Sequence, residues 1–309
     1  MESTDGRPPL YLIVRSNAAT HAPEPLREAV EAAGERFAFE PVRGPDEIPR
    51  AVGRALDAGY STLAITGPDA AFSRAADAVL ASGAGGDVTL GIVPAGRSHD
   101  IAATLGIGSL TTAVDAILSG SVTTIDAARA TTGDGTVVTH FVVAAAAGWA
   151  PPADGIIRPA PRRLATGANR VAAAAMRLAR SPARSFTLSI DGRERDGRYS
   201  AISMHNLARW QSGLLAAPGA SPRDGLLDVL RWRAQSRRDL LRTVRAQIDG
   251  TREHSDDDIE RSPGRLVELS SPRTTTLLAD GRDAGRLPAR IEVLPGALRV
   301  LVPRNIPAG

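Results

Sequence analysis

The chain has 309 residues and a mass of 32.2 kDa, a size that suits one large domain or two ordinary ones. It contains no cysteine, and all 37 of its basic residues are arginine, which excludes disulfides, thiolate chemistry, a P-loop lysine and a lysine Schiff base. The net charge is +3, but residues 151–250 hold 18 Arg against eight Asp and Glu, a surplus that favours an anionic partner or forms a solvated arginine-rich surface.

Strand and helix patterns alternate through the first 125 residues. Strands are expected at 10–14, 37–42, 62–66 and 90–94, and helices at 24–33, 46–58, 70–81, 98–105 and 111–118. A series of this kind predicts a parallel sheet with right-handed crossovers. Ligands of such sheets bind at the carboxyl ends of the strands, so a site is expected in the loops after Val14, Ile65 and Val93.

The pattern changes after residue 125. Strands are expected at 137–146, 185–190, 199–205, 226–232, 265–270, 274–279, 289–293 and 298–302, with helices only at 165–179 and 237–249. Most of these strands are separated by Gly, Pro or Asp turns, which is typical of antiparallel pairing. The predicted fold class is therefore α/β + β, with a parallel α/β domain at 1–125 and an antiparallel β-rich domain at 126–309 whose last residues return to the first domain.

Three local patterns have a structural interpretation. Asp69 follows Gly-Pro and has the position of a helix N-cap. Asp224 is the first residue of an Asp-Gly turn. In Ser98-His99-Asp100, consecutive residues cannot face one another as a triad, so Ser98 is interpreted as a helix cap and His99 as a ligand contact.

The order of several motifs resembles the diacylglycerol kinase catalytic family, which includes bacterial lipid kinases, sphingosine and ceramide kinases and, more distantly, NAD kinases. The segments that carry the resemblance are P-A-G-R-S-H-D-I-A-A-T-L-G-I (94–107), N-L-A-R-W-Q-S-G (206–213), A-P-G-A (217–220), D-G-L-L-D-V (224–229), D-G-R (280–282) and the closing run 287–303. They occur in the family's order and cover the chain from about residue 10 to 303.

The resemblance implies a nucleotide domain and a β-rich domain with ATP in a cleft between them. It also implies a glycine-rich loop after the third strand whose N–H groups approach the phosphates, and a late acidic residue that takes the proton of the acceptor hydroxyl. Magnesium would neutralise the charge that develops during transfer. For two residues the resemblance implies an alternative to the structural interpretation: Asp69 would contact magnesium-bound phosphates, and Asp224 would hold a structural cation.

Four loops depart from the family motifs. The G-G-D-G-T-x-N-E loop is G-P-D-A-A-F-S-R (67–74), the opening N-P-x-S-G is R-S-N-A-A (15–19), T-G-N is R-S-H (97–99) and D-G-E is D-G-R (280–282). Pro68 removes an amide donor and Ala70 adds a Cβ, and Arg282 cannot accept a proton. Loss of a general base lowers rates by about 10²–10⁴, and loss of an electrostatic donor by about 10²–10³ more.

Two functions follow from this reading. The first is a lipid-kinase homologue with impaired or altered phosphoryl transfer that acts as a ligand-binding or regulatory protein. The alternative is an active ATP-dependent kinase, or an enzyme of altered chemistry, on a lipid or small hydroxyl substrate, with a site rebuilt from arginines that fall in loops. The candidate catalytic residues are Asp280, Arg282 and Asp69. The candidate nucleotide-binding residues are Arg15, Asn17, Gly67, Asp69, Arg74, Gly96, Arg97, Ser98 and His99, and Asp224 is the candidate metal ligand.

The expected ligand is a lipid or small molecule in the interdomain cleft, with ATP and Mg²⁺ as the cofactors that the resemblance implies. Arginines at helical spacing, 170, 177 and 184 and then 238, 242 and 245, predict peripheral contact with an anionic membrane. No nucleic acid is expected, since the basic segment lacks interleaved aromatics, and a homodimer is left open. No apolar run or basic leader suggests a membrane span or signal peptide, so the chain is expected to be cytoplasmic.

Overall fold

The computed structural model describes residues 10–15, 26, 28, 31, 37–95, 98–133, 135–148, 183–210, 214–233 and 259–304. The chain forms two compact units. Unit 1 comprises residues 1–125 and 296–309, and unit 2 comprises residues 126–295. Among the described residues, no helix is long and apolar enough to cross a membrane.

Unit 1 is built on a parallel sheet. Its strands are β1 (Leu10–Arg15), β2 (Phe37–Val42), β3 (Thr62–Gly67) and β4 (Thr89–Pro94), in the order β4-β3-β1-β2. Apolar runs such as Thr62–Gly67 are buried almost throughout, as expected for strands covered on both faces.

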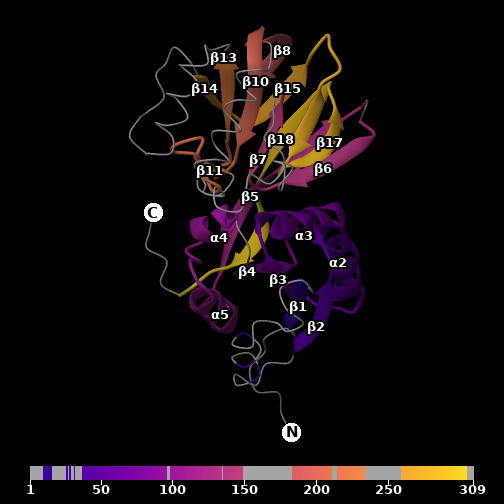
Figure 1. Ribbon diagram of the computed structural model, residues 1–309, viewed down its shortest axis with the longest axis vertical. Helices are drawn as coiled ribbons and strands as arrows, with labels where there is room; N and C mark the ends of the chain where they lie inside the picture. Colours follow the sequence, from indigo (N-terminus) through magenta and orange to yellow (C-terminus); the bar gives the residue numbers. More distant parts are fainter. Residues whose placement is uncertain are drawn as a thin grey trace, which may run out of the picture. The chain divides into compact units, whose positions relative to one another are not determined.

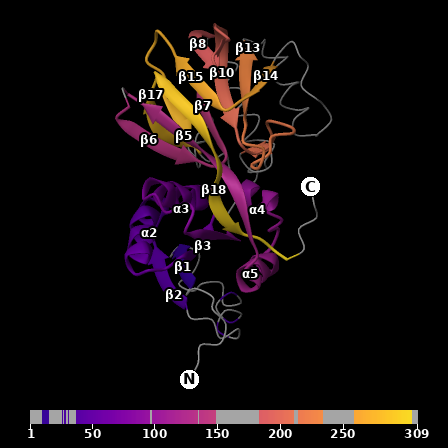
Figure 2. The same cartoon turned by 180° about the vertical axis from the view of Figure 1, so that it is seen from behind.

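The helices of unit 1 follow the strands in alternation. They are η1 (Pro45–Glu47), α2 (Ile48–Asp57), α3 (Asp69–Ala81), α4 (Asp100–Thr104) and α5 (Leu110–Ser119). α2 and α3 pack against each other, and α5 packs against β4, away from them in Figures 1 and 2. The core is aliphatic with one large aromatic, Phe72, fully buried on α3.

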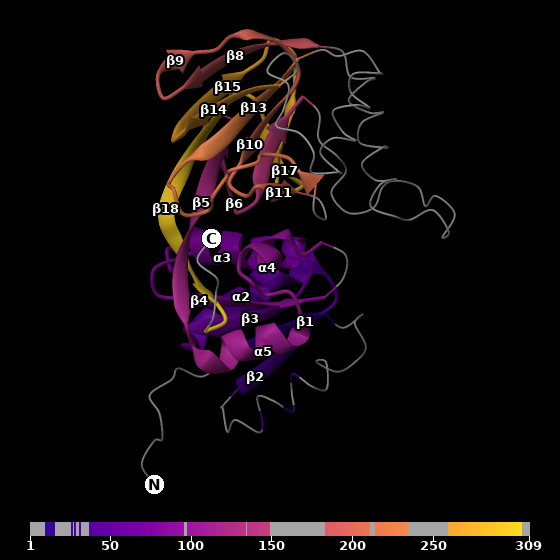
Figure 3. The same cartoon turned by 90° about the vertical axis from the view of Figure 1, so that its left-hand side faces the viewer.

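Unit 2 is almost entirely antiparallel. Its strands, some of which run on into unit 1, are β5 (Val122–Thr132), β6 (Val137–Phe141), β7 (Ala144–Ala147), β8 (Arg184–Ile190), β9 (Arg193–Glu194), β10 (Gly197–His205), β11 (Arg209–Trp210), β12 (Leu214–Leu215), β13 (Leu227–Arg233), β14 (Ile259–Gly264), β15 (Leu266–Ser270), β16 (Thr276–Ala279), β17 (Arg282–Arg286) and β18 (Ala289–Leu301). The main hydrogen-bonded order is β17-β16-β7-β10-β8-β15-β18, and β13 pairs with both β10 and β14. Figure 3 shows how strongly these strands curve.

The predicted fold class is confirmed: parallel strands come first, and antiparallel strands follow. Two predicted boundaries were wrong. The single strand expected at 137–146 is divided into β6 and β7 by a bend at residues 142–143. The two strands expected at 289–293 and 298–302 form one strand, β18. Pro295 and Gly296 do not divide β18, because they lie between the residues of β18 that pair with β15 and those that pair with β4.

Three longer strands were missed. β5 is rich in Thr and Ala instead of Val and Ile, and β17 reads R-D-A-G-R. β14 contains Pro263, which is acceptable because β14 is an edge strand that pairs only with β13 among the described strands. The predicted helices at 165–179 and 237–249, and most of the one at 24–33, lie outside the described residues.

Candidate functional site

In unit 1, the loops that follow β3 and β4 are fastened together by Asp69. Its Oδ2 accepts hydrogen bonds from Ser98 Oγ at 2.6 Å and from the Asp100 amide at 2.7 Å, and its Oδ1 accepts one from the Ile101 amide at 3.0 Å. The carboxylate is buried. The backbone adds two more links, from the Asp69 amide to Ser98 O at 3.0 Å and from the Ala95 amide to Gly67 O at 3.1 Å. Two of the three strand-end loops predicted as a site, those after Ile65 and Val93, therefore do meet; the loop after Val14 lies outside the described residues.

The capping roles differ from the prediction. Asp69 is the first residue of α3, and the N-cap of that helix is Pro68, so Asp69 does not cap its own helix. Its carboxylate instead binds the first amides of α4, about thirty residues along the chain. Ser98 does not cap α4 either: the N-cap residue is His99, and the Ser98 hydroxyl donates to Asp69. Asp69 thus supplies the side-chain acceptor for the first amides of α4, which a Ser or Asp next to the helix in the sequence usually supplies.

Two backbone amides at the junction of β3 and α3 are engaged within the protein. Pro68 has no N–H, the Asp69 amide donates to Ser98 O, and the Ala71 amide donates to Pro68 O at 2.8 Å. A loop that cradles a phosphate needs these amides to point outward. This loop uses them within the protein.

The arginines that were predicted to lie in loops belong to helices or strands where the structure describes them. Arg74 lies within α3, and its guanidinium pairs with the exposed Asp46 of η1. Arg15 is the last residue of β1, and Arg282 is the first residue of β17. Asn17, Gly96 and Arg97 lie outside the described residues.

In unit 2, Asp280 occupies a two-residue turn between β16 and β17. Asp280 and Gly281 have φ values of 45° and 75°, the left-handed conformations of a type I′ hairpin turn. The Asp280 carboxylate accepts hydrogen bonds from three consecutive amides, those of Val142 at 2.8 Å, Val143 at 2.9 Å and Ala144 at 3.0 Å. These bonds hold the bend that separates β6 from β7 and explain why the predicted strand at 137–146 is broken.

Arg282 lies two residues further on. Its Nη2 donates to the carbonyl oxygen of His140 at 3.2 Å, so the cation is also bound to the segment around the bend. His140 is itself buried. The residues around the turn therefore present one carboxylate engaged by three amides and one guanidinium engaged by a carbonyl.

Two buried polar residues next to this segment were not predicted as site residues. Asn206 Nδ2 donates to the carbonyl oxygens of Asp126 at 3.0 Å and Val142 at 2.8 Å, and Asp126 Oδ2 accepts from the Gly225 amide at 2.7 Å. Asp126 carries no signal in the sequence, because the strand that contains it, β5, was itself missed. Asn206 is the first residue of one of the recognised motifs.

The described residues offer little for a metal ion. No group of three or more His, Asp or Glu side chains among them is arranged to hold one. Asp224 Oδ1 accepts a hydrogen bond from the Leu226 amide at 3.0 Å, as expected for an aspartate that forms an Asp-Gly turn.

The shifted pKa values among the described residues lie on β1, β2 and α2, away from these candidates. Burial, followed by the hydrogen bond to Glu40 and its charge, raises the pKa of Tyr11 to about 12. Burial alone would raise the pKa of Glu40, but hydrogen bonds from Arg54 and Tyr11 and the charge of Arg54 hold it below its usual value.

Comparison with known proteins supports the resemblance seen in the motifs. Residues 11–130 match the family described as the diacylglycerol kinase catalytic domain, and residues 157–302 match the YegS C-terminal NAD kinase beta sandwich-like domain. A diacylglycerol kinase of Mycobacterium tuberculosis is 30% identical over 289 residues, which cover 90% of this chain and 91% of that protein. A probable lipid kinase YegS-like of Pseudomonas aeruginosa is 27% identical over 287 residues, which cover 92% and 91%.

Solved structures agree on the fold. A putative diacylglycerol kinase from Bacillus anthracis has a TM-score of 0.78 at 16% identity, with 97% of this chain and 98% of that chain covered. A second structure from the same organism has a TM-score of 0.76 at 15% identity, with 98% of each chain covered. The fold is thus retained over almost the whole length.

Proposed function

Because this chain belongs to the diacylglycerol kinase family, we propose that it is a lipid-kinase homologue in which phosphoryl transfer is lost or strongly reduced. In this proposal it works as a ligand-binding or regulatory protein whose ligand is a lipid or a small molecule. The observation that carries the proposal is the internal use of the backbone amides in the loop between β3 and α3.

A phosphate in that loop would have to displace the protein's own hydrogen bonds. Pro68 has no donor, the amides of Asp69 and Ala71 are bound to Ser98 O and Pro68 O, and Ala70 adds a Cβ where a glycine lets a phosphate approach. The family motif implies a glycine-rich loop at this place. The loss of its free donors removes the main electrostatic support for the transferred group.

The proton acceptor is the second support for the proposal. Arg282 stands where the family motif has an acidic residue, and a guanidinium cannot accept a proton. The adjacent Asp280 carboxylate is a poor substitute, because its removal from Val142, Val143 and Ala144 would leave three amides without an acceptor. Together, the missing base and the missing donors correspond to a rate loss of about 10⁴ or more.

ATP and Mg²⁺ do not fit the described residues in the manner that the family motif implies. Both oxygens of Asp69 already accept hydrogen bonds, and no acidic or histidine cluster for a cation occurs among the described residues. We therefore assign no catalytic step to a bound nucleotide or metal. The proposed roles of Arg15, Asn17, Gly67, Arg74, Gly96, Arg97 and His99 are limited to ligand contact.

The proposal is tested by titration calorimetry with ATP, ADP and NADP, each with and without Mg²⁺, and by turnover on diacylglycerol, sphingosine and ceramide. The Mycobacterium tuberculosis diacylglycerol kinase serves as the positive control. We expect turnover below about 10⁻⁴ of that control. Binding of ATP–Mg²⁺ followed by turnover near the control would establish the alternative, an active kinase with a rebuilt site.

A gain-of-function variant sharpens this test. The triple variant Pro68→Gly, Ala70→Gly, Arg282→Glu restores the amide donor at position 68, removes the Cβ at position 70 and returns the acidic residue. We expect measurable turnover from it. The matched control replaces Arg282→Glu by Arg286→Glu, the same charge change at the exposed end of the same strand. Equal turnover of the two triple variants would show that position 282 does not govern proton transfer.

We also propose peripheral binding to anionic membranes through the arginines at 170, 177, 184, 238, 242 and 245, of which only Arg184 belongs to the described residues. Each basic residue near an anionic leaflet contributes about 1 kcal/mol. Co-sedimentation should therefore be salt-sensitive and specific for anionic vesicles. Equal pelleting with neutral vesicles would contradict this part of the proposal, and light scattering of the same samples would determine whether a homodimer forms.

A further inference from the structure

One arginine of unit 2 faces the protein core. Arg231 lies on β13 directly opposite Ile202 of β10, and opposite residues of an antiparallel pair share one face of the sheet. Ile202 is fully buried in the core, and the side chain of Arg231 is only 7% exposed. A guanidinium in such a place needs compensation for the loss of water.

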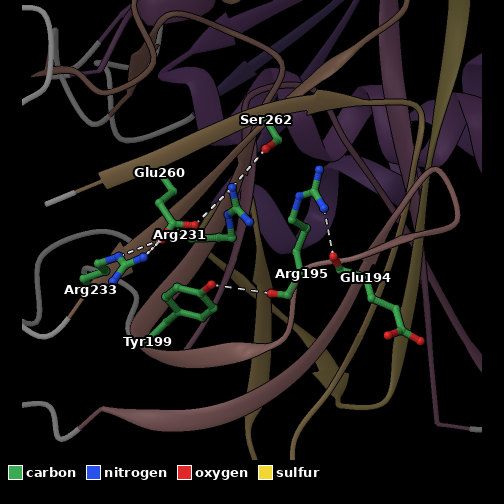
Figure 4. A network of polar contacts seen from close by, with 7 residues as sticks. All are labelled: Glu194, Arg195, Tyr199, Arg231, Arg233, Glu260 and Ser262. Atoms are coloured by element: carbon green, nitrogen blue, oxygen red, sulfur yellow. Dashed lines mark hydrogen bonds and ion pairs between the residues drawn. The ribbon is translucent and has the colours of Figure 1, made fainter. Parts of the chain in front are cut away.

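The compensation from the described residues is incomplete. Arg231 Nη2 lies 3.2 Å from Glu260 Oε2 and donates to Ser262 Oγ at 3.0 Å (Figure 4). Glu260 is shared, however, because Arg233 donates to its Oε1 through Nε at 2.6 Å and also through Nη2. The Nε of Arg231 is buried and has no hydrogen-bond partner within the described part of the chain.

A third arginine belongs to the same neighbourhood. Tyr199 is paired opposite Arg233, and its hydroxyl donates to the carbonyl oxygen of Arg195 at 3.5 Å. Figure 4 shows the Arg195 guanidinium on the Arg231 side of its hairpin, where its Nη1 donates to the carbonyl oxygen of Glu194 at 3.0 Å, while the carboxylate of Glu194 points away. Arg231 and Arg233 therefore share the Glu260 carboxylate, and Arg195 lies on the same side of the hairpin.

We propose that Arg231, Arg233, Arg195 and Ser262 form a binding site for a phosphate group, carried either by a free phosphate or by a lipid headgroup. Guanidinium groups match phosphate oxygens with paired hydrogen bonds, and a bound phosphate would give the buried Nε of Arg231 an acceptor. Arg195 and Arg233 are exposed, so their side chains can move to admit the anion to the buried guanidinium. This site is independent of the proposed loss of phosphoryl transfer.

The alternative explanation is that Arg231 and Glu260 form a buried ion pair with a purely structural role. The variant Glu260→Gln separates the two explanations. A structural pair would only lose stability on this change, whereas an anion site would lose a repelling carboxylate and bind phosphate more tightly, by about threefold or more. Glutamine keeps the length of the side chain and an acceptor for Arg233.

The experiment is calorimetric titration of the full chain with inorganic phosphate. We expect one site per chain. Arg195→Gln should weaken binding by about threefold, as expected for an exposed charge, and Arg231→Gln by about tenfold or more, as expected for a buried charged donor. The matched control is Arg193→Gln, the same change on the same hairpin at a residue outside the cluster, and it should leave the affinity unchanged.

Circular dichroism of each variant separates loss of the site from loss of folding. If Arg231→Gln does not fold, the opposite effects of Arg195→Gln and Glu260→Gln still decide the question. Vesicles with and without phosphatidic acid distinguish the two sources: a headgroup ligand requires that binding to phosphatidic acid also depends on Arg195. Absence of phosphate binding up to about 10 mM, or equal weakening by Arg193→Gln and Arg195→Gln, would overturn the proposal.

Discussion

Asp69 in unit 1 and Asp280 in unit 2 both occupy motif positions that the family resemblance assigns to phosphoryl transfer, and each carboxylate accepts three hydrogen bonds from the protein. They differ in their donors. Asp69 binds one mobile hydroxyl, that of Ser98, and two amides. Asp280 binds three consecutive amides and has a left-handed backbone with φ 45°.

The donors indicate two structural roles: Asp69 links two loops, and Asp280 holds the bend between two strands. Without Asp69, the Ser98 hydroxyl can rotate to another acceptor, but the buried amides of Asp100 and Ile101 lose their carboxylate acceptor. Without Asp280, the bend between β6 and β7 has no other carboxylate among the described contacts. The Asp-Gly pair of the D-G-R motif therefore has a structural reason to be present that does not depend on catalysis. The third residue of the motif, Arg282, also binds this segment, through the carbonyl oxygen of His140.

The largest expected effect is that of Asp280→Ala. Three amides lose a charged acceptor and an alanine is placed at positive φ, so the free energy of unfolding of unit 2 should fall by about 3–5 kcal/mol. Urea unfolding followed by tryptophan fluorescence measures it, because all three tryptophans, at 149, 210 and 232, belong to unit 2.

The matched control is Asp224→Ala, which also removes an aspartate from an Asp-Gly turn but, within the described part of the chain, releases only the Leu226 amide. Its cost should be about 1 kcal/mol or less. If both variants lose the same stability, the three amide bonds of Asp280 are not what distinguishes it.

Asp69→Ala should have a smaller and more local effect. We expect a loss of about 2 kcal/mol in unit 1, with faster hydrogen exchange at the amides of Asp100 and Ile101 and little change in β1 and β2. The exposed Asp57→Ala on α2 is the control and should leave these amides unchanged. Faster exchange throughout unit 1 would mean that Asp69 supports the whole sheet and not only the two loops.

The elements that the sequence predicted well are those whose own residues determine them. β3 and β4 are apolar runs of buried parallel strands, and α3 ends before Gly83, whose φ of 80° suits a glycine after a helix. β5 was missed because an alternation of Thr, Ala and Asp carries little strand signal. The family resemblance, based on the ordered motifs, is confirmed by the relatives.

The contacts at the candidate site could not be predicted because they join distant parts of the chain. Asp280 bends a strand that lies about 140 residues earlier, and Asp69 caps a helix about 30 residues later. Local propensity favours a continuous strand at 137–146 and a Ser cap at 98, and tertiary hydrogen bonds override both. The arrangement of the four loops around one interdomain cleft stays a prediction.

Ser98→Ala tests whether the hydroxyl contributes separately to the Asp69 contacts. We expect a loss of about 1 kcal/mol, since one hydrogen bond to a charged group is removed while the two amide bonds remain. Ser98→Thr keeps the hydroxyl and should retain most of the stability. A loss as large as that of Asp69→Ala would show that Ser98 positions the carboxylate for the amides.

The smallest change in stability is expected for Tyr11→Phe. This variant tests a part of unit 1 where the protonation state of a side chain contributes to the free energy of unfolding. The pKa of Tyr11 is raised from 10 to about 12. The contribution of the protonated hydroxyl to the free energy of unfolding is therefore complete below pH 10 and is lost as the pH rises towards 12. Removal of the hydroxyl should cost about 0.5–1 kcal/mol at neutral pH. The difference between wild type and variant should therefore shrink between pH 10 and about 12.

Far-ultraviolet circular dichroism measures this effect, because the described helices lie in unit 1. The control is Tyr60→Phe, which keeps the ring that contacts Tyr11 edge-on at 4.9 Å and leaves Glu40 and Arg54 in place. At acid pH the dependence on pH has the opposite sign. The pKa of Glu40 is lowered, so the contribution of its carboxylate to the free energy of unfolding is present above the usual pKa of a glutamate and is lost as the pH falls below that pKa. A pH-independent difference between wild type and Tyr11→Phe would show that the hydroxyl acts by packing alone and that the Glu40 charge does not stabilise it.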